Sequence, residues 1–205
     1  MIPMEDIREV IRNIKKELRL FMNGVTSAQL RKLGMEYNII FGVSIPHLKE
    51  IAGKFPHDAE VAKALWKENI RESKLLAIFM LPEENYDNVA GEWIGECRYK
   101  ENTDHLAHCI LSRLPDAKEK ALRWAADDDR LYCYCGFLTL AHLFRNRQTL
   151  SLDEEQRFFA AIARQAATDT LKESGAAKAL EIYIGEDEER GARFRAFNNQ
   201  STAQG

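Results

Sequence analysis

Apolar side chains recur every three or four positions along most of this chain, which is the spacing that places them on one face of an α-helix. Near the start, Ile7, Ile11, Ile14 and Leu18 form such a stripe. The other face of the same stretch carries the basic residues Arg8, Arg12, Lys15, Lys16 and Arg19. The pattern therefore predicts an amphipathic helix whose apolar face packs on a protein core.

Residues typical of helix ends divide the rest of the chain into further helices. Ser44 and Asp58 each mark the start of a helix, because their side chains can accept hydrogen bonds from the first free backbone amides. Pro46 supports the first of these starts, since proline is favoured in the first turn of a helix. The acidic run 127–129 is expected to form a solvated turn that caps the next helix, and Pro82 and Pro115 separate neighbours. The expected helices cover residues 44–55, 58–68, 71–81, 83–98, 103–114, 116–126, 130–140, 152–167 and 170–185.

No segment shows the strict apolar–polar alternation of a half-buried strand. The best candidate, "IIFGVSI" at residues 39–45, is short and isolated, and we interpret it as a connector. The sequence therefore predicts an all-α fold.

The sequence also contains a recurring unit. In each clear copy, a helix with a tryptophan near its end is followed by a polar link and then by an apolar helix. Trp66 and Trp124 occupy equivalent places 58 positions apart, and a weaker copy at 166–169 follows Ala125 by about 41 positions. Helix pairs of HEAT-like proteins recur every 40–47 residues and bury their apolar faces by stacking. We therefore expect one curved HEAT-like solenoid domain over residues 1–197, in which both tryptophans pack between helices, and a disordered polar tail at 198–205.

Composition narrows the class of protein. The chain has 205 residues, of which 45% are hydrophobic, with no apolar run long enough to cross a membrane and no apolar core of a secretory signal near the start. Its four cysteines are too sparse for a disulfide framework. These features favour a cytoplasmic protein with reduced thiols. The formal net charge of −3 does not by itself indicate a nucleic-acid binder, although a local basic patch can still bind phosphate.

The stretch "KENTDHLAHC", residues 100–109, gathers Asp104, His105, His108 and Cys109 within a turn and a half of one expected helix. His105 and Cys109, four positions apart, could supply two zinc ligands, but a closed zinc site needs three or four and no second pair follows at a fixed spacing. A cysteine nucleophile would need a third group to orient the histidine. We therefore interpret the stretch as a polar helix face at the rim of a concavity, and expect no metal and no cofactor.

Three segments carry a resemblance to a known family. "YNIIFGVSIPHLKEIAGKF", "ALWKENIRESKLLAIFML" and "WAADDDRLYCYCGFLTLAHLF" resemble helix pairs of the DNA alkylation repair family, the HEAT-like alkylpurine DNA glycosylases. The resemblance runs from about residue 37 to about residue 185. It implies a curved solenoid that cradles duplex DNA through its backbone. It also implies release of cationic alkylated purines, with an aspartate that stabilises the developing oxocarbenium ion.

The catalytic pattern implied by the resemblance is incomplete in this chain. The family helix begins close to N-W-D-x-x-D, and this chain reads "NTDHLA", so that Asn102 and Asp104 match, Thr103 replaces the tryptophan and Ala107 replaces the catalytic aspartate. Tyrosines and cysteines of 130–140 stand where the family carries a tryptophan and paired arginines, and Ile182 or Tyr183 stands at a further DNA-facing tryptophan. The resemblance therefore implies weak or absent glycosylase activity, with Asp104 as the remaining candidate catalytic acid after a shift in register.

Basic residues flank this expected helix, where a HEAT-like solenoid would meet phosphates. The candidate DNA-binding residues are Arg98, Lys100, Arg113, Lys118 and Arg123. Two hypotheses remain: a duplex-DNA-binding protein of the alkylation repair family, or a HEAT-like interaction module whose concave face binds a protein partner.

Overall fold

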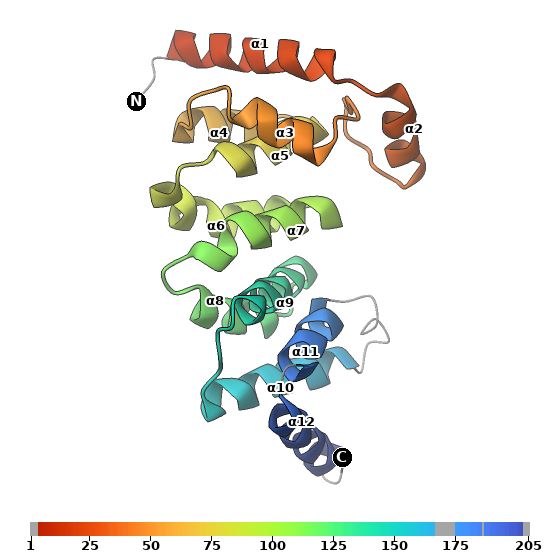
Figure 1. The fold of residues 1–205 in the computed structure, drawn as a ribbon, viewed down its shortest axis with the longest axis vertical. Coiled ribbons are helices and arrows are strands. Elements are labelled where there is room, and N and C mark those ends of the chain that lie inside the picture. The colour runs from red at the N-terminus through yellow and green to blue at the C-terminus, as the bar shows by residue number, and fades with distance from the viewer. Residues whose placement is uncertain (1–3, 167–174, 186, 203–205) are drawn as a thin grey trace. The chain divides into compact units, whose positions relative to one another are not determined.

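The computed structural model describes residues 4–166, 175–185 and 187–202 of the chain (Figure 1). The regular elements among the described residues are all helices, and the one strand-like pairing there is an isolated parallel bridge between Ile39 and Ile70. The prediction of an all-α fold is therefore confirmed, and the connector predicted at 39–45 is correct for residues 39–44, since a helix begins at Ile45. Within the described ranges, no helix is both long enough and apolar enough to cross a membrane.

The chain divides into two compact units, residues 1–89 and 90–205. We expected a single domain over 1–197, and whether the two units act as one stays a prediction. The first unit contains α1 (Met4–Leu20), α2 (Gly24–Lys32), α3 (Ile45–Ala52), α4 (Ala59–Trp66), α5 (Arg71–Met80) and the short 3-10 helix η1 (Glu83–Asn85). After α6 (Tyr86–Glu96), the second unit contains α7 (Lys100–Cys109), the 3-10 helix η2 (Leu111–Arg113), α8 (Ala117–Ala125), α9 (Arg130–Arg145), α10 (Leu152–Ala166), α11 (Gly175–Gly185) and α12 (Glu188–Thr202).

The core of the first unit forms where α1 and α5 each pack on both α3 and α4. Ile14 and Leu18 of the predicted α1 stripe are fully buried, as is Leu65 of α4. Asp58 caps α4 as expected, since its carboxylate accepts hydrogen bonds from the amides of Glu60 and Val61 at 2.9 and 3.2 Å. Trp66, at the end of α4, is 1% exposed and therefore packs in the core rather than contacting a ligand.

A buried ion pair holds the connector between α2 and α3. The carboxylate of Glu72 accepts hydrogen bonds from the amides of Phe41 and Gly42 at 3.0 and 2.9 Å. Arg71 donates to Glu72 at 2.8 Å and to the carbonyl of Val43 at 3.0 Å. Gly42 has φ of 76°, and a Cβ there would lie 2.2 Å from the carbonyl oxygen of Asn23, so only glycine fits.

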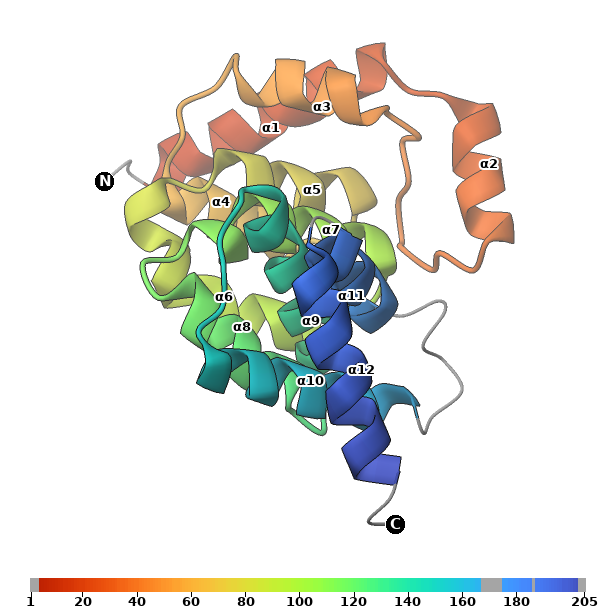
Figure 2. The same ribbon diagram turned by 60° about the horizontal axis from the view of Figure 1, so that its bottom comes forward.

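Helix α9 is the centre of the second unit, packed by α7, α8 and α11 (Figure 2). Asp129 begins it as an N-cap, accepting from the amides of Leu131 and Tyr132 at 2.8 and 3.2 Å. Gly136 lets α8 approach closely, because a Cβ at this position would lie 2.3 Å from the backbone nitrogen of Ala125. Trp93 and Trp124 are 1% and 5% exposed, so both pack in the core.

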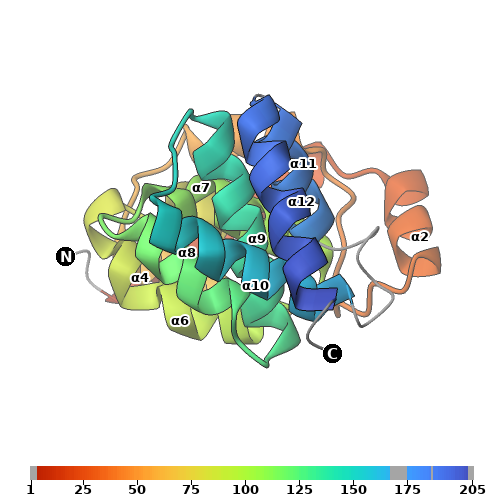
Figure 3. The same cartoon turned by 90° about the horizontal axis from the view of Figure 1, so that it is seen from below.

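Helices α9, α10, α11 and α12 end the second unit (Figure 3). Their aromatic side chains pack together in one cluster. Tyr183 is 1% exposed and its hydroxyl donates to the buried carboxylate of Glu155 at 2.7 Å. Arg193 of α12 donates to both oxygens of Glu155 at 2.7 and 3.0 Å. These contacts anchor α12, whose polar sequence gave no helical signal.

Several expected boundaries differ from the structure. The helix expected at 103–114 begins at Lys100, ends at Cys109 and is followed by the 3-10 turn η2. The disordered tail was expected from residue 198, but α12 continues to Thr202, so the expectation is wrong for residues 198–202. The end of the helix predicted at 152–167, the first residues of the one predicted at 170–185 and most of the third repeat copy lie outside the described residues. Helices α4 with α5 and α8 with α9 pack as pairs, while their HEAT-like stacking stays a prediction.

Candidate functional site

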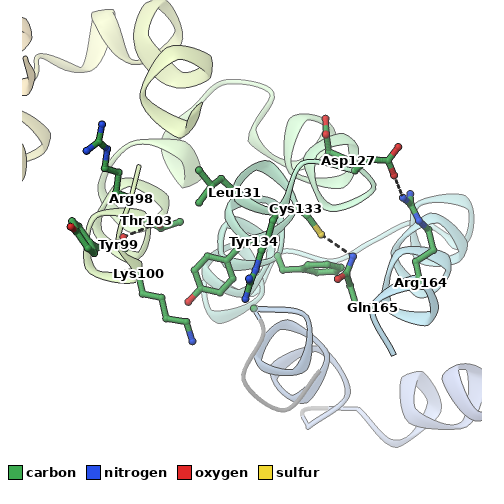
Figure 4. Close-up of a pocket in the computed structure, with 14 residues that line it drawn as sticks. Arg98, Tyr99, Lys100, Thr103, Asp127, Leu131, Cys133, Tyr134, Arg164 and Gln165 are labelled. Carbon is green, nitrogen blue, oxygen red and sulfur yellow. Dashed lines mark hydrogen bonds and ion pairs between the residues drawn. The ribbon is translucent and has the colours of Figure 1, made fainter. Parts of the chain in front are cut away.

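A pocket of about 760 Å³ lies in the second unit, between the start of α7, the first turns of α9 and the ends of α8 and α10 (Figure 4). Basic, aromatic and small side chains line it together. Its position follows from the fold, because α9 packs on α7, α8 and α11 and so brings segments from residue 98 to residue 175 to one place. A pocket of this size and lining can hold part of a polar, anionic ligand.

Four cations line the pocket: Arg98, Lys100, Arg130 and Arg164. Arg98 and Arg130 are exposed, and no ion pair or hydrogen bond of their side chains occurs within the described part of the chain. Arg164 is held by a hydrogen bond of 2.6 Å to the carbonyl of Ala126 and by an ion pair with Asp128. With Asp127 and Asp128 also on the lining, the pocket keeps an excess of positive charge.

Tyr134 presents an aromatic ring to the same pocket (Figure 4). The ammonium of Lys100 lies 5.8 Å from its ring centroid, a contact between helices α7 and α9. Burial raises the pKa of Tyr134 to about 12, with contributions from the charges of Asp104 and Cys135. The phenol therefore stays protonated at neutral pH and can donate a hydrogen bond.

The family-motif positions on α7 do not present a carboxylate to this pocket. Thr103, at the tryptophan position, is buried and donates to the carbonyl of Tyr99 at 3.1 Å. Ala107, at the aspartate position, is fully buried. Asp104 does not line the pocket, and its Oδ1 is buried without a hydrogen-bond partner among the described residues. The helical wheel had placed Asp104 on the polar side of α7, yet this oxygen is buried, and the charge of Asp104 raises the pKa of Tyr134 and of Cys135 on α9.

The histidine and cysteine residues of α7 lie apart from the pocket. The ring of His108 packs on the ring of His142 from α9, with centroids 4.7 Å apart. His105 and Cys109 are half-buried, and Cys133 and Cys135 are buried with pKa values raised by burial. Across the described residues, no three histidine, cysteine or acidic side chains gather closely enough to hold a metal ion.

The predicted DNA-binding residues are divided by the structure. Arg98 and Lys100 line the pocket, whereas Arg113, Lys118 and Arg123 do not. Arg113 and Arg123 are exposed on η2 and α8, and Lys118 forms an ion pair of 3.0 Å with Glu154. Of the two candidates for the last DNA-facing tryptophan, Tyr183 is buried in the aromatic cluster and Ile182 is half-buried.

Sequence reasoning missed Arg130, Tyr134 and Arg164 as pocket residues. Arg130 and Tyr134 are four positions apart on one predicted helix, so their common face could have been found from the spacing. Arg164 comes from α10, thirty or more positions after these two residues in the sequence, and carries no local signal.

One comparison with known proteins gives a match. A family model described as DNA alkylation repair enzyme matches residues 14–190. Neither the curated proteins nor the solved structures contain a match to this chain.

Proposed function

Because this chain belongs to the DNA alkylation repair family, we propose that it binds duplex DNA through the sugar–phosphate backbone, with the pocket of the second unit as one phosphate-binding surface. The family supports a role related to DNA repair. The observation that carries the proposal is the pair Arg98 and Arg130, exposed beside Lys100 and without ion-pair partners of their own among the described residues. Arginine guanidinium groups with free donors suit phosphate oxygens, which they can contact through two parallel hydrogen bonds.

Glycosylase activity on alkylated purines is weak or absent under this proposal. An alkylated purine already carries positive charge, so the main demand on the protein is a carboxylate close to the sugar. Ala107 cannot provide one, and the Oδ1 of Asp104 is covered by protein. The chain's own residues can therefore bind and orient a duplex without stabilising charge at the anomeric carbon.

Duplex affinity as a function of salt tests the binding proposal. Each phosphate contact contributes about 0.9 to the slope of log affinity against log salt concentration. Replacing Arg98 and Lys100 together by Gln should therefore lower the magnitude of this salt slope by up to about 1.8. The variant should bind DNA duplexes of different sequence more weakly by similar factors. The measurement is fluorescence anisotropy with a labelled duplex at several salt concentrations.

A matched control changes the net charge equally outside the pocket. Arg145 and Arg195 are exposed residues that do not line it, and replacing both by Gln should leave the slope nearly unchanged. Equal losses in the two double variants would contradict a specific role for the pocket. No duplex binding by the unmodified protein, even at low salt, would favour the alternative of a protein-interaction module.

Base release from methylated duplex DNA tests the second half of the proposal. We expect release of 7-methylguanine and 3-methyladenine at the spontaneous rate, and no difference between the unmodified protein and Asp104→Asn. Robust release abolished by Asp104→Asn would refute the proposal and make Asp104 the catalytic acid. Robust release that survives this substitution would also refute it and would point to another carboxylate.

A further inference from the structure

Helix α1 carries a basic stripe, Arg8, Arg12, Lys16 and Arg19, in which all four side chains are exposed. At about 100° per residue, these positions fall within an arc of about 80° on one face of the helix. Glu9 borders the stripe at its N-terminal end, and from Arg12 to the end of the helix the stripe contains only cations. The one acidic residue in that part, Glu17, lies away from the stripe and pairs with Lys54 at 3.1 Å.

The cations of the stripe form no ion pair with any residue that the structure describes. No ion pair joins Arg8, Arg12 or Arg19 to another described residue, and Lys16 makes a hydrogen bond of 3.0 Å to the neutral amide of Asn13. Lys15, just beside the stripe, differs because it pairs with Glu68 of the first unit. An unused row of like charges on a stable helix costs self-repulsion, which an anionic partner would remove.

The other face of α1 decides between the classes of anionic partner. Ile14 and Leu18 are fully buried in the first unit, and among the described side chains of α1 the one large apolar group that is mostly exposed is Leu20, 75% exposed at the end of the helix. One such side chain is too little apolar surface to hold a helix in a membrane interface. Three of the four cations are arginines, whose planar donors match phosphate oxygens. From Arg8 to Arg19 the helix rises by about 16 Å, which corresponds to roughly five nucleotide steps of one strand at about 3.4 Å each.

We propose that the basic stripe of α1 is a second phosphate-backbone contact for duplex DNA, separate from the pocket of the second unit. The inference rests on the proposed function, because it takes duplex DNA as the partner. The family match begins at residue 14, so Arg8 and Arg12 lie ahead of the matched range. Lys16 and Arg19 lie within that range.

The test replaces Arg12 and Lys16 together by Gln, which keeps a good helix former at both exposed positions. Duplex affinity should fall at low salt, and the slope of log affinity against log salt concentration should decrease by up to about 1.8. The Arg145→Gln/Arg195→Gln variant, with the same change in net charge, should keep the original slope. Thermal unfolding of each variant shows whether the fold is intact.

Parallel measurements separate this inference from the proposed function. If Arg98→Gln/Lys100→Gln weakens duplex binding and Arg12→Gln/Lys16→Gln does not, the stripe proposal is overturned while the proposed function stands. If only the α1 variant weakens binding, the stripe is supported and the role of the pocket fails. Absence of duplex binding in the unmodified protein overturns both.

Binding to phosphatidylserine vesicles tests a membrane surface as the partner of the stripe. If the Arg12→Gln/Lys16→Gln variant loses vesicle binding but keeps duplex binding, the stripe belongs to a membrane contact and the proposal is overturned.

Discussion

His142 is held neutral at physiological pH by its surroundings. Burial, together with the positive charges of His108, Arg145 and Lys178, lowers its pKa to about 4. The imidazole packs on the ring of His108 from the neighbouring helix α7. Protonation of His142 therefore opposes the packing of α7 on α9.

The sign of the resulting pH dependence follows from the depressed pKa. The unfolded chain takes up a proton at His142 near its ordinary pKa of about 6.5, whereas the folded chain does so only near 4, so the free energy of unfolding falls as the pH drops through this window. We expect His142→Gln to lose less stability than the unmodified protein between about pH 6.5 and about pH 4. Urea unfolding at several pH values measures the difference, and parallel losses in both proteins would contradict it.

At the scale of single residues, the sequence predicted which residues stand at the catalytic positions, but it did not predict which of their side-chain atoms are buried. The resemblance placed Ala107 at the aspartate position, and spacing placed Asp104 on the polar side of the helix. A helical wheel contains no information about the parts of the protein that pack on the helix, so the burial of Oδ1 could not be predicted. The same limit explains Arg164, which reaches the pocket from a distant helix.

At the scale of helices, Gly136 controls how closely α8 and α9 approach. A Cβ at this position would lie 2.3 Å from the backbone nitrogen of Ala125 and 2.7 Å from the carbonyl oxygen of Ala121. Both atoms belong to the backbone of α8, so the clash can be relieved only by moving one helix away from the other. The close packing of this pair therefore depends on a single missing methyl group.

We expect Gly136→Ala to destabilise the protein by about 2 kcal/mol or more, although alanine is the better helix former. Thermal or urea unfolding provides the measurement. Gly95→Ala is the matched control, because its Cβ would meet only the Tyr132 side chain at ordinary contact distance, 3.7 Å from the hydroxyl oxygen, and it should be neutral or stabilising. A Gly136→Ala variant as stable as this control would show that the two helices separate without cost.

The predicted helices succeeded where apolar periodicity and a capping residue occurred together. Asp58 and Asp129 both cap as expected. Helix α5 was identified in full from its apolar pattern and from Pro82 after it, since Ile70 at its start provides no side-chain cap. Helix α2 was missed because it has no buried residue and hence no apolar stripe. Helix α12 was missed for a related reason. It is held to the core by the hydrogen bond from Arg193 to Glu155, and a pairing of two charged side chains cannot be recognised from the spacing of apolar residues.

At the scale of the whole molecule, net charge and local charge have opposite signs at the proposed DNA contacts. The chain carries a formal net charge of −3 and has a pI near 6.0, yet the pocket and the α1 stripe are locally basic. The long-range field of the protein therefore repels a polyanion that its local surfaces attract.

This balance predicts a pH effect on duplex affinity. Lowering the pH from about 8 to about 6 removes most of the net negative charge, so affinity should rise at low salt. The rise should become small near 0.1 M salt, where charges more than about 10 Å apart are screened. Anisotropy titrations at the two pH values test this, and the Arg98→Gln/Lys100→Gln variant should show a similar relative rise because its pocket is not the source. Affinity that is independent of pH at low salt would contradict the prediction.

The buried pair of Arg71 and Glu72 gives the connector between α2 and α3 an unusual kinetic property. The amides of Phe41 and Gly42 donate to a fully buried carboxylate, although no strand or helix includes them. Amide protons exchange with solvent only when such hydrogen bonds open, and these can open only if the core around Glu72 opens too. The two amides should therefore exchange as slowly as those of the neighbouring core helices, so that a segment without regular secondary structure reports on the unfolding of the first unit.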